Sequence, residues 1–95
     1  MKRTTYYVVT RAVQFGQPLA TWKFSIALRW PTPIAAAHET LFIFCASPTR
    51  IPVHPEKAVD ELWNRATARF GDALHSVSLN DGMVEWVHMI AEPEP

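Results

Sequence analysis

The sequence of 95 residues predicts a single α+β domain, with helices on one face of an antiparallel sheet of about four or five strands. Residues 20–30 alternate between apolar and polar side chains, as a half-buried strand does. Residues 55–70 repeat apolar side chains at helical spacing. Asn80-Asp81-Gly82 separates two β-rich segments, which is typical of a hairpin. The predicted order is ββ-α-β-α-ββ, and this length supports one core.

The first predicted strand covers residues 4–13, which are rich in β-branched and aromatic side chains. A turn is expected at residues 14–19, where Gly16 and Pro18 occur. The second strand, residues 20–30, follows directly. Its apolar face consists of Trp22, Phe24, Ile26, Leu28 and Trp30.

The register of this predicted hairpin follows from the charge of Arg11. Pairing Arg11 with Lys23 keeps both on the exposed face, beside Tyr7, although their charges repel. A slip of one residue would place Arg11 against Trp22 and in the core, which is strongly unfavourable. We therefore expect Arg11 and Lys23 to share the exposed face.

Pro31 and Pro33 end the second strand, and Thr32 is expected to cap a short helix that starts at Pro33. Residues 40–46 are ambiguous. Their length and β-forming side chains favour a buried strand, and the alternative is that the helix continues to Cys45.

Helix 55–70 is the clearest helical pattern, and His54 is expected at its N-cap or in the preceding loop. Acidic residues lie early and arginines late in this segment, which suits the helix dipole. Gly71 is expected to end it. Its apolar stripe consists of Val59, Leu62, Trp63, Ala66 and Phe70.

The C-terminal segments 74–79 and 83–91 are predicted strands. A two-residue turn at Asp81-Gly82 would pair His75 with His88. Both faces of the last strand are fairly apolar, so we expect it to lie inside the sheet or to be covered. The domain is predicted to span residues 1–91, and residues 92–95 to form a flexible acidic tail.

The formal net charge is zero, but residues 1–38 carry five basic and no acidic residues, whereas all nine acidic residues follow. This asymmetry indicates binding of a polyanion or a partner, or else two halves that complement each other internally. The single cysteine excludes an internal disulfide. We expect neither a signal peptide nor a membrane span, and a cytoplasmic location.

Residues with catalytic or metal-binding potential are few. The sequence contains no phosphate loop and no zinc-binding motif. His75 and His88 are the candidate metal ligands, but no third ligand accompanies them. Cys45 lies in apolar company, where a thiol is usually inert. We expect no cofactor and no enzymatic activity, the alternative being a small enzyme or metal-binding protein centred on the histidines.

The candidate binding residues are Tyr7, Arg11, Lys23 and Arg29, on the exposed face of the first hairpin. Basic and aromatic groups on a sheet suit either a protein partner or single-stranded nucleic acid. No RNA-recognition motif is present, and the tryptophans of this hairpin face the expected core. Four tryptophans in 95 residues are many for so small a core. This favours a protein interface, either between two copies of the chain in a homodimer or with another protein.

No motif identifies a family. The general profile is that of a compact, neutral, non-catalytic α+β domain with a short charged tail. In this it is similar to small inhibitors that phages and mobile elements encode, anti-CRISPR proteins among them. The resemblance implies a viral protein that blocks a larger host complex by occupying a surface. Nucleic-acid binding through the basic hairpin is the alternative.

Overall fold

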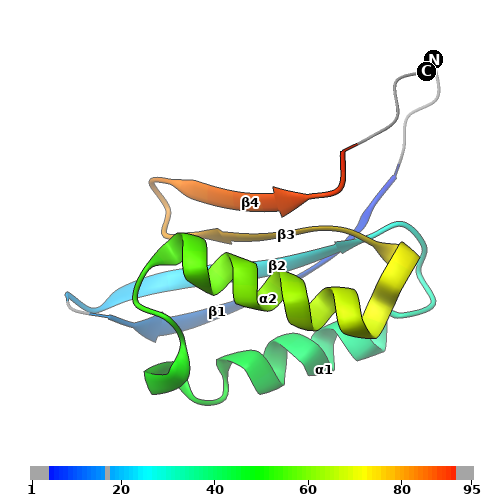
Figure 1. Ribbon diagram of the computed structural model, residues 1–95. Coiled ribbons are helices and arrows are strands. Elements are labelled where there is room, and N and C mark those ends of the chain that lie inside the picture. The colour runs from blue at the N-terminus through cyan, green and yellow to red at the C-terminus, as the bar shows by residue number, and fades with distance from the viewer. Residues whose placement is uncertain (1–4, 17, 92–95) are drawn as a thin grey trace.

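The computed structural model describes residues 5–16 and 18–91, which form a four-stranded antiparallel sheet with two helices on one face (Figure 1). The strand order is β1-β2-β3-β4, so that β1 and β4 are the edges. This confirms the α+β class. The elements are β1 (Tyr7–Phe15), β2 (Ala20–Leu28), α1 (Ile34–Cys45), the 3-10 turn η1 (Pro48–Arg50), α2 (Pro55–Phe70), the 3-10 turn η2 (Gly71–Ala73), β3 (Leu74–Asn80) and β4 (Glu85–Met89).

The core lies between the sheet and the helices, with α1 over β1 and β2 and α2 over β3 and β4. Phe24, Ile26 and Leu28 of β2 are fully buried, and Leu62 and Ala66 of α2 pack in the same cluster. The predicted bounds of α2 are confirmed, with His54 at the N-cap and Gly71 at the C-terminal end. Gly71 ends the helix with φ of +54°, a conformation that favours glycine.

The register of the first hairpin differs by one residue from the prediction. Tyr7 pairs with Leu28 and Arg11 with Phe24, so Arg11 lies on the helix-covered face. Its charge is nevertheless exposed, because β1 is an edge strand and the guanidinium reaches out over the Phe42 ring of α1, 4.7 Å from its centroid. An inward-pointing charge on an edge strand also discourages sheet-to-sheet aggregation.

Residues 40–46 do not form a strand, because α1 continues to Cys45. The side chains of Ala37, Leu41 and Phe44 recur at helical spacing and are buried. Thr40, also buried, donates its hydroxyl to the backbone carbonyl oxygen of Ala36, 2.8 Å away. Tertiary burial therefore outweighs the β propensity of this segment. The helix starts at Ile34 with Pro33 at the N-cap, one residue later than predicted.

The second hairpin has a longer turn than predicted. Val77 pairs with His88 and Leu79 with Trp86, so that residues 81–84 connect the strands. The Oδ1 atom of Asp81 accepts hydrogen bonds from the backbone N–H groups two and three residues later, both at 3.0 Å, and this closes the turn.

The last strand was predicted to lie inside the sheet or to be covered, and this prediction is wrong. The strand β4 lies at the edge of the sheet. Val87 and Met89 are exposed on the face of the sheet that carries no helix. Neither helix of the described chain combines the length and the hydropathy needed to cross a bilayer. The tail predicted at residues 92–95 lies outside the described residues.

Candidate functional site

The four candidate binding residues do not share one surface. Tyr7 is half-buried against the core, and Arg11 lies on the helix-covered face. Lys23 is exposed on the face of the sheet that carries no helix, which we call the open face, and it pairs with Asn80 of β3. Arg29 follows β2 and is half-buried; its Nε atom is buried without a hydrogen-bond partner among the described residues. The fold thus separates Arg11 from Lys23 by the thickness of the sheet.

The two candidate metal ligands are also apart. His75 stacks on Tyr6, with ring centroids 3.8 Å apart, and its Nδ1 lies 3.2 Å from the Ser76 hydroxyl. His88 is opposite Val77 and not opposite His75. Among residues 5–16 and 18–91, no group of three or more potential ligands surrounds a common point.

His88 instead connects β4 to α2. Its ring stacks on Trp63 at 4.1 Å with an interplanar angle of 7°, and its Nδ1 lies 3.2 Å from Asp60 Oδ1. Cys45 is buried, and this burial raises the pKa of its thiol to about 11, against the opposing effect of Arg11. A thiol with that pKa is protonated and unreactive at neutral pH.

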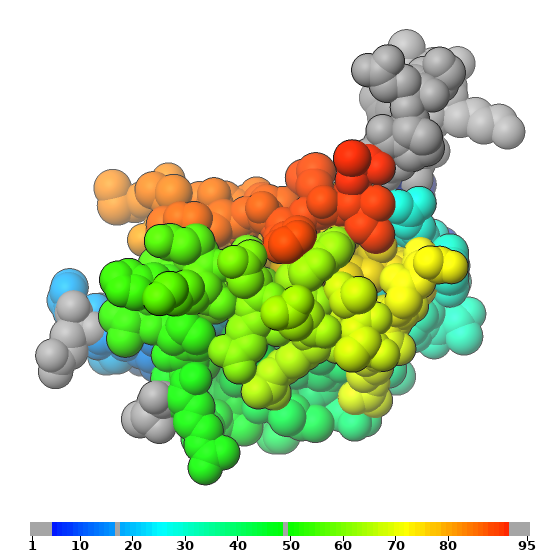
Figure 2. All heavy atoms as spheres, in the orientation of Figure 1, coloured from blue at the N-terminus to red at the C-terminus, as the bar shows by residue number. Residues whose placement is uncertain are grey.

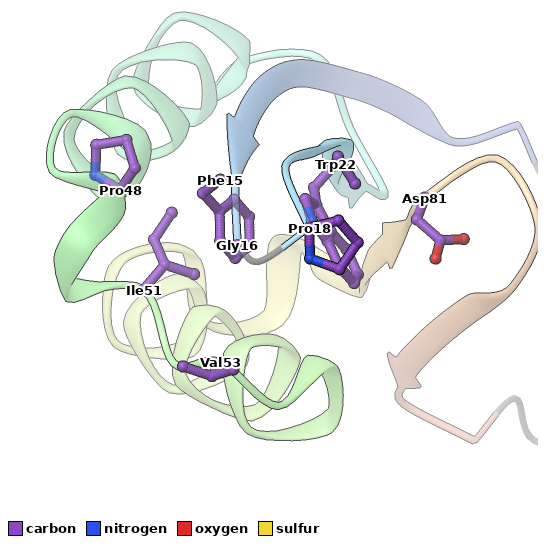
Figure 3. Close-up of a pocket in the computed structure, with 9 residues that line it drawn as sticks. Phe15, Gly16, Pro18, Trp22, Pro48, Ile51, Val53 and Asp81 are labelled. Atoms are coloured by element: carbon purple, nitrogen blue, oxygen red, sulfur yellow. The ribbon is translucent and has the colours of Figure 1, made fainter.

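Three connections meet at one end of the molecule, opposite the end at which β1 begins and β4 finishes (Figure 1). They are the β1–β2 turn, the segment between α1 and α2, and the β3–β4 turn; we call this region the loop end. It contains a half-open groove of about 600 Å³ (Figure 3). The apolar side chains that line the groove are Phe15, Pro18, Trp22, Pro48, Ile51 and Val53.

The groove arises where the aromatic layer of the core runs beyond the helices. Phe15 and Trp22 stack at 5.3 Å between ring centroids, and Trp22 packs against Trp86 at 5.8 Å. Gly16 turns the chain with φ of +94° next to the Trp22 indole. A Cβ on Gly16 would stand 3.9 Å from Trp22 Nε1.

Two polar groups lie in this apolar setting. Asp81 stands at the edge of the groove beside Pro18 and Trp22 (Figure 3), and is the only ionisable residue in its described lining. Hydrogen bonds from the backbone of Val84 and then Met83 lower the pKa of its carboxyl, so it is ionised at neutral pH. The other group, Trp22 Nε1, is buried without an acceptor among the described residues.

Four exposed apolar side chains lie in the connections of the loop end, and one of them, Val53, lines the groove. Their exposed fractions are 68% for Leu19, 80% for Val53, 92% for Met83 and 52% for Val84. In Figure 2 the three segments that carry them, blue, green and orange, project at the left of the molecule. Large apolar residues in three different turns, between glycines and prolines, are the sequence signal by which this site could have been found.

Comparisons of this chain with models of protein families, with curated proteins and with solved structures gave no match.

Proposed function

We propose that the chain is a non-enzymatic protein-interaction module that binds its partner through the loop end. The observation that carries this proposal is the apolar groove of about 600 Å³ together with the four exposed apolar side chains in the connections of the loop end. Small monomeric proteins rarely expose large contiguous apolar patches, and those that do usually bind something there. Interface centres are apolar and rich in aromatic residues, as this groove is.

The charges favour a protein partner over nucleic acid. A nucleic-acid surface needs several cations that follow the phosphates. The groove instead carries the carboxylate of Asp81, and Arg11 and Lys23 lie on opposite faces of the sheet. The described lining of the groove offers one ionisable group, and acid–base or nucleophilic catalysis usually requires at least two that interact.

The module would act by occupying a surface of a larger assembly. This is how the small inhibitors of phages and mobile elements act, to which the sequence profile is similar, and the proposal extends to such an inhibitory role in the cytoplasm. The arrangement of the loops on the core supports this proposal. A single core holds three loops at one end, and rigid scaffolds that present loops are suited to binding.

The proposal is tested by affinity capture from a lysate of the organism that encodes the protein. The immobilised chain is compared with Val53→Asp and with the matched control Val8→Asp, which places the same charge on the open face. After nuclease treatment, the chain and Val8→Asp should retain the same stoichiometric protein. Val53→Asp should bind it at least about tenfold more weakly, since a charge would enter the centre of the interface.

Equal capture by both variants would show that the loop end is not the binding surface. Loss of all captured protein on nuclease treatment would favour nucleic acid. Circular dichroism of both variants distinguishes lost binding from lost folding, and we expect unchanged spectra because both positions are exposed.

A further inference from the structure

We infer that the groove recognises a partner segment in which a large apolar side chain stands next to a lysine or an arginine. This inference rests on the proposed function, since it names the chemistry of the partner at the same site. The apolar side chain would enter between Phe15, Ile51 and Trp22, and the cation would pair with Asp81 at the edge.

The size and lining of the groove favour the apolar element. Its volume of about 600 Å³ lies within the ~300–1,000 Å³ typical of sites that enclose a small ligand. Aromatic rings form one wall, and Pro48 and Ile51 form the wall opposite (Figure 3). Such walls bind a large aliphatic or aromatic side chain by excluding water from it.

The hydrogen bonding of the Asp81 carboxylate favours a basic side chain in the partner. Its Oδ1 is held by two backbone N–H groups at 3.0 Å, so the carboxylate is oriented before a partner arrives. Its Oδ2 forms no hydrogen bond with another described residue, and no basic side chain of the described chain makes an ion pair with it. The carboxylate therefore has a free acceptor oxygen for an ammonium or guanidinium group.

The position of Asp81 determines where the cation stands in the partner. Asp81 lies at the edge of the groove beside Pro18 and Trp22, and not at its centre (Figure 3). Neighbouring Cα atoms are 3.8 Å apart, and lysine and arginine side chains are long. We therefore place the basic residue next to the inserted one in the partner, with its long side chain extending past Pro18 and Trp22 to the carboxylate (Figure 3). An acidic residue there would be repelled.

Three blocked dipeptides test this inference without knowledge of the partner: acetyl-leucyl-arginine amide, acetyl-leucyl-glutamine amide and acetyl-alanyl-arginine amide. Binding is followed by NMR through backbone amides and the indole N–H of Trp22, which Trp22→Phe identifies. Leucyl-arginine should shift Gly16, Val53 and the Trp22 indole. It should bind about two- to fivefold more tightly than leucyl-glutamine, the range for an exposed ion pair.

Asp81→Asn is the decisive variant, because asparagine keeps an Oδ1 acceptor for the turn and removes the charge. In this variant leucyl-arginine and leucyl-glutamine should bind equally. In the unaltered chain, equal affinity of these two peptides would overturn the inference, as would equal affinity of alanyl-arginine and leucyl-arginine, or no shift in the groove with any peptide. Capture that Val53→Asp abolishes would still support the proposed function in each of those cases.

Discussion

The centre of the helix-covered face and the loop end belong to one apolar layer, but they are packed differently. Phe24, Ile26 and Leu28 have no exposed surface beneath the helices. The same layer continues into Phe15 and Trp22, and there it borders a groove. The centre is filled because α1 and α2 lie over it, whereas the loop end extends past them. The contrast indicates that the centre supports the fold and that the loop end is available for binding.

Substitution at the centre should have the largest effect on stability. Phe24→Ala removes a fully buried ring that packs edge-on against Phe44 at 5.3 Å. We expect the free energy of unfolding to fall by about 3–5 kcal/mol, since the cavity cannot fill with neighbouring atoms. Urea unfolding followed by tryptophan fluorescence measures this. A loss below about 1 kcal/mol would show that the centre is not packed as described.

Gly16→Ala should have a smaller effect, because it strains the loop end alone. Gly16 has φ of +94°, which an alanine adopts with strain, although its Cβ would make only ordinary contacts. The expected loss is about 1–2 kcal/mol. The same unfolding experiment measures it, and an unchanged midpoint would mean that the tip relaxes freely.

The two regions should also respond to opposite extremes of pH. Burial raises the pKa of Cys45 to about 11 from the ordinary thiol value of 9.0. Between these values the unfolded chain loses the thiol proton and the folded chain keeps it, so stability falls as the pH rises. Cys45→Ala should remove this part of the alkaline loss. The measurement is the free energy of unfolding of the chain and of the variant at several pH values between these two pKa values. Identical pH dependences would contradict the prediction.

At the loop end the sign is reversed. Backbone hydrogen bonds lower the pKa of Asp81, so its carboxylate stabilises the turn above the ordinary carboxyl pKa. This contribution is lost as the pH falls through the lowered value. Asp81→Asn should lack it, and NMR titration of the Asp81 carboxyl carbon measures the direction directly. A pKa at or above that of a free aspartate would contradict the described turn.

Val53→Ala should have the smallest effect on stability. The side chain is 80% exposed, so we expect a change within about 0.5 kcal/mol in the free energy of unfolding. Thermal unfolding by calorimetry is sufficient to measure it. A loss as large as that of Phe24→Ala would mean that the loop end supports the fold, and the distinction between the two regions would fail.

The sequence predicted what depends on local pattern and missed what depends on sheet position. The apolar spacing and end signals of α2 were sufficient to predict residues 55–70 as a helix. The predicted register of the first hairpin was wrong because the sequence pattern does not reveal that β1 is an edge strand. At an edge, Arg11 can face the helices and still reach water. The continuation of α1 through Phe44 depends on burial against the sheet, which outweighs local propensity.

The prediction of the binding site failed for the same reason, because it depended on positions in the sheet. Tyr7, Arg11, Lys23 and Arg29 were grouped by an assumed register, and the fold distributes them over different surfaces. The groove could not be derived from the sequence, because its walls come from three segments that are far apart in the chain. The large apolar residues in turns, such as Leu19, are a feature of the sequence that could have indicated it, but they were not used.

The central claim is that the loop end contacts a protein partner, and site-specific photo-crosslinking in the native host tests it most directly. A photoreactive phenylalanine analogue replaces Val53 in one variant and Val8 in the other; both positions are exposed. We predict one discrete, nuclease-resistant protein adduct from position 53 and none from position 8. An adduct from position 8 alone, a nucleic-acid adduct, or no adduct from either position would contradict the claim.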